Sequence, residues 1–274
     1  SYNPDLHKAS DSAINGAGTV VAGGARIWGF ISDHLKWRSG RLNENKEIKE
    51  LVESKLRPLD LVYEKRTFVL SNYTIPGHWG HVGIWLGTKE ELISLKIWDK
   101  DYFRPYQKYV LEGKKIVEIR KKGANFQGLD TFLNLDEFAI TRFTDILVNA
   151  EEVYKEIFSQ LEKEYDFKFD ARTADKITCA ELISFSYGDI KWPESKALFQ
   201  VTLRPDDIGR LTLNKDSGEE LILYLKGNKK APPSILNFED WKKVFETKKE
   251  KKDAKAKAKK IEASPSFEEI YGRG

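Results

Sequence analysis

The chain has 274 residues, 40% of them hydrophobic, with a net charge of +3 and a single cysteine. One cysteine excludes an internal disulfide, and no apolar run reaches the roughly 20 residues needed to span a bilayer. The small net charge gives no reason to expect nucleic-acid binding across the whole surface. We therefore expect a protein with a real core, built as one large domain or two small ones.

The first 56 residues are expected to form a helical extension. Ala13–Ile31 is rich in small residues and favours a helix that packs on the main domain; a lid or membrane-surface segment is the alternative. Glu44–Leu56 places Ile48 and Val52 on one helical face, which predicts a second helix.

From Arg57 the pattern changes to short strands. Runs of β-type residues, several with alternating polarity, predict an antiparallel sheet with one solvated face. The predicted strands are Leu59–Tyr63, His81–Leu86, Lys115–Arg120 and Glu137–Arg142.

Two helices follow these strands. Asn149–Tyr165 carries an apolar stripe, and Asn149 with Glu152 three residues on predicts a capped start. Cys179 is expected to open the next helix, with Leu182, Ile183 and Phe185 buried behind it.

The chemistry of the chain centres on its lone cysteine. A thiol reacts as the thiolate, which both a helix N-terminus and a nearby imidazole favour. A single cysteine with a histidine remote in sequence is the pattern of a cysteine hydrolase, and His81 opens an apolar strand that would hold its ring.

Several weak motifs occur in a characteristic order. Together they resemble the permuted NlpC-like cysteine hydrolases, the YiiX/YebB-like branch of the papain-like superfamily, over roughly 57–211. In that branch the histidine strand precedes the cysteine helix, as it does here. The matching stretches are Leu59-Asp60-Leu61-Val62, His81-Val82-Gly83-Ile84-Trp85-Leu86-Gly87, Val117-Glu118, Leu129-Asp130-Thr131-Phe132-Leu133, Tyr165-Asp166-Phe167, Thr178-Cys179-Ala180-Glu181-Leu182 and Arg204-Pro205-Asp206-Asp207.

The resemblance implies an α+β, papain-like fold of circularly permuted NlpC type, an antiparallel sheet packed on helices. It also implies a site in which Cys179 is the nucleophile, His81 the base and Glu118 the residue that orients the imidazole. The chain departs from the family in two places. Leu59 stands where many members have glycine, and the insertion Ser94–Lys114 is long and aromatic.

Substrate contacts are assigned to His78, Trp79 and Tyr165. The backbone N–H of Cys179 is one expected oxyanion donor, and His78 and Tyr165 both remain open as the second. No zinc-type spacing and no phosphate-binding glycine loop occurs in the sequence, so we expect no metal and no cofactor.

Simpler interpretations stand beside these. Cys179 would then be a small buried hydrophobe. Glu118 would lie on a solvated strand among the basic residues Lys114, Lys115, Arg120, Lys121 and Lys122. The aromatic rings of Ser94–Lys114 would either line an acyl-chain groove or form a cap.

The domain layout is predicted as an extension over 1–56, a hydrolase domain over 57–226 and a polar basic tail over 227–274. Leu236–Phe245 reads as a short docking helix. Lys248–Lys260 is rich in lysine and alanine, which suits either a solvated, partly helical tail or electrostatic attachment to anionic lipid, cell-wall polymer or nucleic acid.

The resulting hypothesis is a cysteine amidohydrolase or peptidase that cleaves an amide bond in a cell-envelope substrate such as a peptidoglycan peptide, in the periplasm or envelope. The substrate class rests on the resemblance. Two alternatives are a lipid-directed acyltransferase or hydrolase of the same superfamily, and a module that binds an envelope ligand without turning it over.

Overall fold

The computed structural model describes residues 38–69, 77–120, 122–161, 164–165, 176–188, 190–193, 195–197 and 200–246. The helix expected within Ala13–Ile31 and the basic stretch Lys248–Lys260 lie outside these ranges. Over the described part of the chain, no helix combines the length and the apolar character that crossing a bilayer requires.

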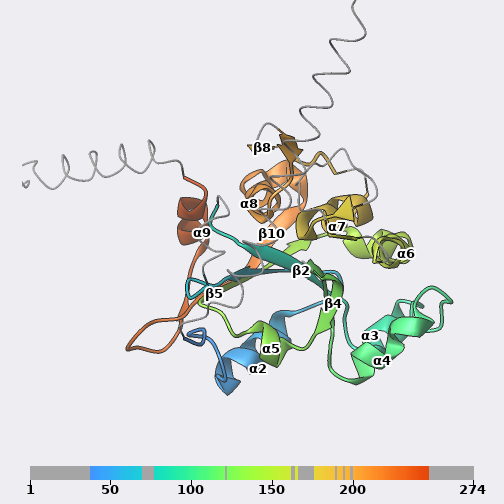
Figure 1. The fold of residues 1–274 in the computed structure, drawn as a ribbon, viewed down its shortest axis with the longest axis horizontal. Coiled ribbons are helices and arrows are strands. Elements are labelled where there is room, and N and C mark those ends of the chain that lie inside the picture. Colours follow the sequence, from blue (N-terminus) through green and yellow to red (C-terminus); the bar gives the residue numbers. More distant parts are fainter. Residues whose placement is uncertain are drawn as a thin grey trace, which may run out of the picture. The chain divides into compact units, whose positions relative to one another are not determined.

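A seven-stranded antiparallel sheet forms the centre of the structure, in the order β11-β10-β5-β1-β2-β3-β4 (Figure 1). The four strands predicted from the sequence are confirmed, and β4, β10 and β11 are added to them. The strands are β1 (Leu61–Lys65), β2 (His81–Trp85), β3 (Ile116–Arg120), β4 (Gly123–Gln127), β5 (Glu137–Phe143), β10 (Glu219–Lys226) and β11 (Ser234–Ile235). Two small sheets pair β6 (Glu164–Tyr165) with β7 (Lys176–Ile177), and β8 (Ser195–Ala197) with β9 (Gln200–Thr202).

Helices cover both faces of the sheet, with α2 and α5 on one side and α6 and α7 on the other (Figure 1). The α+β class is thereby confirmed. The solvated face expected of the sheet is wrong, because helices pack on both sides and β1, β2 and β3 are buried along almost their whole length. The helices are α2 (Lys46–Lys55), α3 (Lys89–Ser94), α4 (Gln107–Leu111), α5 (Leu129–Phe132), α6 (Ala150–Gln160), α7 (Cys179–Ser186), α8 (Pro205–Gly209) and α9 (Phe238–Val244). Short 3-10 turns are η2 (Arg104–Tyr106), η3 (Ile146–Asn149), η4 (Arg210–Leu213) and η5 (Lys215–Ser217).

Helix α2 shows how the sequence builds the core. The Asn45 side chain accepts a hydrogen bond from the Ile48 backbone at 3.0 Å and so satisfies one of the first N–H groups of the helix. Ile48 and Val52 are buried in one cluster with sheet residues such as Val62. The helix predicted over Glu44–Leu56 is confirmed, and its apolar stripe belongs to the main core.

Three expectations about the later helices are wrong. The Asn149 side chain makes no capping bond, because α6 continues directly from the helical turn η3 and its entry is already helical. The helix also ends at Gln160 rather than at Tyr165. In α7, Leu182 and Ile183 are buried as expected, but Phe185 is 37% exposed because it lies on the outer face of the helix.

The aromatic insertion Ser94–Lys114 packs onto the body of the domain. The Tyr109 ring stacks on Phe126 of β4 with centroids 4.2 Å apart, and Tyr106 stacks on Phe158 of α6 at 4.5 Å. Because these rings lie against protein rings, the arrangement favours a cap over an acyl-chain groove.

The chain divides into two compact units, Ser1–Leu236 and Asn237–Gly274. The second unit contains α9, which confirms a helix within Leu236–Phe245, and Trp241 and Phe245 of that unit are buried. The domain boundaries proposed at residues 56 and 226 stay predictions.

Candidate active site

His81 and Glu118 form a buried pair on neighbouring strands. His81 is the first residue of β2, and its Nε2 lies 2.8 Å from Oε2 of Glu118 in β3. The Glu118 side chain is fully buried, so it does not lie on a solvated face. A carboxylate on one ring nitrogen fixes the tautomer and the orientation of the imidazole.

Cys179 reaches this pair from the start of α7. Thr178 and Glu181 form a reciprocal capping box there: Thr178 Oγ1 accepts from Glu181 N at 3.3 Å, and Thr178 N donates to Glu181 Oε2 at 2.7 Å. Glu181 therefore has a structural role at the start of the helix. The helix packs against β2 and β3, and Cys179 lies near enough to His81 to raise the pKa of its imidazole. Since Glu118 occupies Nε2, Nδ1 is the nitrogen left for the thiol.

The charges around His81 favour its protonated form. Burial and the Arg120 cation lower the pKa of His81, but Cys179 and Glu118 outweigh them and raise it to about 9. Below that pH His81 therefore carries a positive charge beside the Cys179 side chain. A helix N-terminus adds to this, because the N–H groups of its first turn point toward the cysteine.

Glu118 is itself held by donors that the sequence analysis did not identify. Its Oε1 accepts hydrogen bonds from Arg120 Nε at 2.5 Å, Asn125 Nδ2 at 2.6 Å and Gln127 Nε2 at 3.1 Å. Burial would raise the pKa of Glu118, but Arg120 and His81 hold it well below its usual range. Glu118 therefore stays ionised beside the imidazole.

His78 has other partners. Its Nε2 lies 2.8 Å from Glu137 Oε2 and its Nδ1 lies 2.8 Å from Lys65 Nζ, so both ring nitrogens are engaged. The backbone N–H groups of His78 and Trp79 donate to the Asp206 carboxylate at 2.8 and 2.7 Å. These bonds hold the loop that leads into β2, and the Trp79 side chain is buried.

The substrate contacts assigned to His78 and Trp79 stay predictions. Both ring nitrogens of His78 are engaged by Glu137 and Lys65, and the side chain of Tyr165 lies outside the described residues. The second oxyanion donor therefore stays open.

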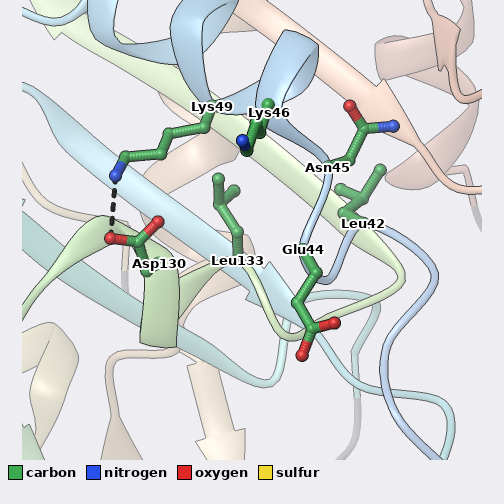
Figure 2. Close-up of a pocket in the computed structure, with 7 residues that line it drawn as sticks. All are labelled: Leu42, Glu44, Asn45, Lys46, Lys49, Asp130 and Leu133. Carbon is green, nitrogen blue, oxygen red and sulfur yellow. Dashed lines mark hydrogen bonds and ion pairs between the residues drawn. The ribbon is translucent and has the colours of Figure 1, made fainter.

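A separate hollow of about 240 Å³ lies where α2 meets α5 (Figure 2). Leu42 and Leu133 line it, and Lys49 pairs with Asp130 across it at 2.8 Å. Because its lining holds no cysteine and no histidine, it offers no nucleophile and no base. Among the described residues, no group of three or more histidine, cysteine and acidic side chains is arranged to hold a metal ion.

A cysteine at a helix start, beside a histidine that a carboxylate orients, has the parts that acyl transfer by a thiol requires. This arrangement, on an antiparallel sheet covered by helices, is that of a papain-like cysteine hydrolase. The chain belongs to the permuted papain-like amidase family, YaeF/YiiX, C92, whose family model matches residues 55–245. It is therefore a cysteine amidase or peptidase, as the sequence predicted. No curated protein and no solved structure matches the chain.

Proposed function

We propose that this protein hydrolyses an amide bond through Cys179 as nucleophile, His81 as base and Glu118 as the orienting carboxylate. The observation that carries the proposal is the position of His81, which is hydrogen-bonded to Glu118 and near enough to Cys179 for the cysteine to raise the pKa of the imidazole. Membership of an amidase family supports the reaction class.

In the proposed reaction, the Cys179 thiolate attacks the amide carbonyl and forms a tetrahedral intermediate. In this proposal the backbone N–H of Cys179, in the first turn of α7, donates a hydrogen bond to the oxyanion. The His81 imidazolium then gives its proton to the departing amine, which leaves an acyl-enzyme. Water, deprotonated by the now neutral His81, attacks the thioester and releases the acid.

For the substrate we propose an amide in a cell-envelope polymer, such as a peptidoglycan peptide, and for the location the periplasm or envelope. Support comes from the sequence resemblance and from the packing of Tyr106 and Tyr109 against protein rings, which favours a peptide over an acyl chain. The basic residues of 248–260 are proposed to contact an anionic membrane or wall surface. Sedimentation with phosphatidylglycerol vesicles, with and without residues 248–274, tests that contact.

Alkylation by iodoacetamide tests the catalytic assignments directly, since Cys179 is the only cysteine. In the wild type the reaction should already be fast below neutral pH, because the imidazolium persists until the pH passes through about 9. In His81→Ala the pH of half-maximal rate should move upward, because no cation then favours the thiolate. Glu118→Gln should move it part of the way.

His78→Ala is the matched control, a second histidine paired with a glutamate in a different network. It should leave the alkylation profile nearly unchanged. If His78→Ala moved the profile and His81→Ala did not, the assignment of the base would be wrong.

Substrate class is tested with two inhibitors that trap the nucleophile, a peptidyl acyloxymethyl ketone and a long-chain acyl chloromethyl ketone. We expect rapid covalent capture at Cys179 by the peptidyl inhibitor and none by Cys179→Ala. Capture by the acyl inhibitor alone would point to lipid chemistry instead. Capture by neither, with an unreactive thiol, would indicate a binding module.

A further inference from the structure

We propose that Arg120 is a positioning residue of this site: its guanidinium bridges Glu118 and Glu64 and so orients the Glu118 carboxylate toward His81. The inference rests on the function proposed above. Arg120 is outside the set of residues that the sequence pointed to, and it touches neither the thiol nor the imidazole in any hydrogen bond found here.

The first observation is that the two oxygens of the Glu118 carboxylate have different hydrogen-bond partners. Arg120 Nε donates to Oε1 at 2.5 Å, and Asn125 and Gln127 from the edge strand β4 donate to the same oxygen. Three donors on Oε1 leave Oε2 to His81. The charged donor is the strongest of the three, so it contributes most to the orientation of the carboxylate.

The second observation is that the two terminal nitrogens of the Arg120 guanidinium bind a different carboxylate. Its two terminal nitrogens donate to Glu64 at 3.2 and 2.9 Å, and Arg66 also donates to Glu64 at 2.8 Å. Glu64 lies directly opposite His81 in the pairing of β1 with β2. Every nitrogen of Arg120 therefore has a carboxylate partner, and this favours a role in holding the site over a role in binding a substrate anion.

The third observation is the set of charges that face His81. Glu64 approaches from β1, Glu118 and Arg120 from β3, and Cys179 from α7. Of these four, only Arg120 is a cation, and it acts with burial to lower the pKa of His81. A general acid works best when its pKa lies near the working pH. Without Arg120, three anionic groups would hold the imidazolium too firmly for efficient proton transfer to the leaving amine.

Arg120→Gln and Arg120→Lys separate the charge from the geometry. Glutamine removes the charge, so the titration midpoint of His81 should rise by about 1 pH unit. Lysine keeps the charge but cannot bridge Glu118 and Glu64 with a planar fork. It should leave the midpoint close to the wild-type value while slowing Cys179 alkylation several-fold at pH 7.

Imidazole ¹⁵N NMR of the full-length protein measures the midpoint, since the chain has only four histidines and His81→Ala assigns the signal. Arg142→Gln is the matched control. Arg142 forms an equally short forked pair with Asp60, at 2.7 and 2.8 Å, and its side chain is only 15% exposed. We expect this variant to lose stability without moving the His81 midpoint.

The inference is overturned if Arg120→Gln leaves the midpoint in place, or if Arg142→Gln moves it as far. Should Arg120→Gln fail to fold, Arg120→Lys decides, because an unchanged alkylation rate in that variant would also contradict the positioning role. Failure of the proposed function itself has a different signature: His81→Ala would then leave the alkylation of Cys179 unaltered.

Discussion

Gly83 lies opposite Glu118, because the pairing of Ile84 with Val117 places the preceding and following residues across from each other. A Cβ atom on Gly83 would lie 3.0 Å from Ile116 Cγ2 and 3.5 Å from Glu118 Cβ. The missing side chain thus leaves Glu118 the space to reach His81, which lies two residues earlier on the same strand face.

Gly83→Ala should therefore cost about 1–3 kcal/mol of stability through crowding in a packed sheet, and it should slow Cys179 alkylation by displacing Glu118. Thermal unfolding and iodoacetamide kinetics measure the two effects. Gly80→Ala is the control, since its Cβ would meet only the Glu64 carbonyl at 4.0 Å. Equal losses of stability and of alkylation rate in the two variants would mean that the space beside Glu118 does not determine how the carboxylate reaches His81.

Leu59 is one of the two departures from the family pattern, and its surroundings show how leucine is accommodated where many members have glycine. Its backbone lies in the left-handed region at φ 65°, which glycine adopts at little cost and leucine does not. The conformation is held because Leu59 N donates to Trp85 O and its carbonyl accepts from the Tyr187 hydroxyl, both at 2.8 Å. Complete burial of the leucine side chain offsets the strain.

At the scale of elements, the start of α7 carries the nucleophile, and its capping box fixes where that start lies. Helix α3 begins with the same motif, Thr88 with Glu91. The two boxes have similar geometry, with the side-chain bonds at 3.3 Å in α7 and 3.2 Å in α3. The box at Thr178 is next to Cys179, whereas the box at Thr88 is not, so the second box is a matched control for the first.

Thr178→Ala and Thr88→Ala should each lower stability by about 1 kcal/mol, the usual value of an N-cap. Only Thr178→Ala should also slow the alkylation of Cys179, because the first turn of α7 then frays and the thiol loses its fixed place beside His81. Thr178→Ser should restore the rate. An unchanged rate in Thr178→Ala would show that packing alone positions the cysteine.

Periodicity predicted β1, β2, β3 and β5 because each is a short apolar run in the centre of the sheet. It missed β4, a polar edge strand with no buried residue, and β10, whose run of apolar residues from Leu221 to Leu225 lacks alternation. Strands of these kinds are defined mainly by the partner they pair with, and a single sequence does not show the partner.

The site was predictable to a similar degree. Cys179, His81 and Glu118 carry motifs, whereas Arg120 stands in a basic stretch that resembles a solvated face. What distinguishes it is that Glu118 and Arg120 are two apart on one strand and so share a face. This shared face indicates a role for Arg120 only once the structure shows that Glu64 of β1 binds the same guanidinium.

At the scale of the whole molecule, a second buried carboxyl joins three strands of the sheet. Glu219 at the start of β10 accepts hydrogen bonds from Thr141 of β5 at 2.5 Å and from Tyr63 of β1 at 3.2 Å. Its other oxygen is buried without a hydrogen-bond partner among the described residues. Burial outweighs the two hydrogen bonds and raises the pKa of Glu219 to about 8, so the acid is neutral in the folded protein at neutral pH.

Folding should therefore become less favourable as the pH rises from about 4.5 toward the pKa of folded Glu219, about 8. An unfolded glutamate ionises near 4.5, whereas the folded one resists ionisation until about 8. The stability due to Glu219 is fully present below pH 4.5 and is lost between pH 4.5 and 8, by at most about 1.4 kcal/mol per pH unit. Thermal unfolding from pH 5 to 8 should show this fall in the wild type and a smaller one in Glu219→Gln, which has no charge to gain. Glu220→Gln, at the exposed neighbouring position, should keep the wild-type slope. If Glu219→Gln and the wild type lost stability in parallel across this range, Glu219 would have to be ionised in the folded protein, and the unpartnered oxygen would need a cation or water that compensates its charge.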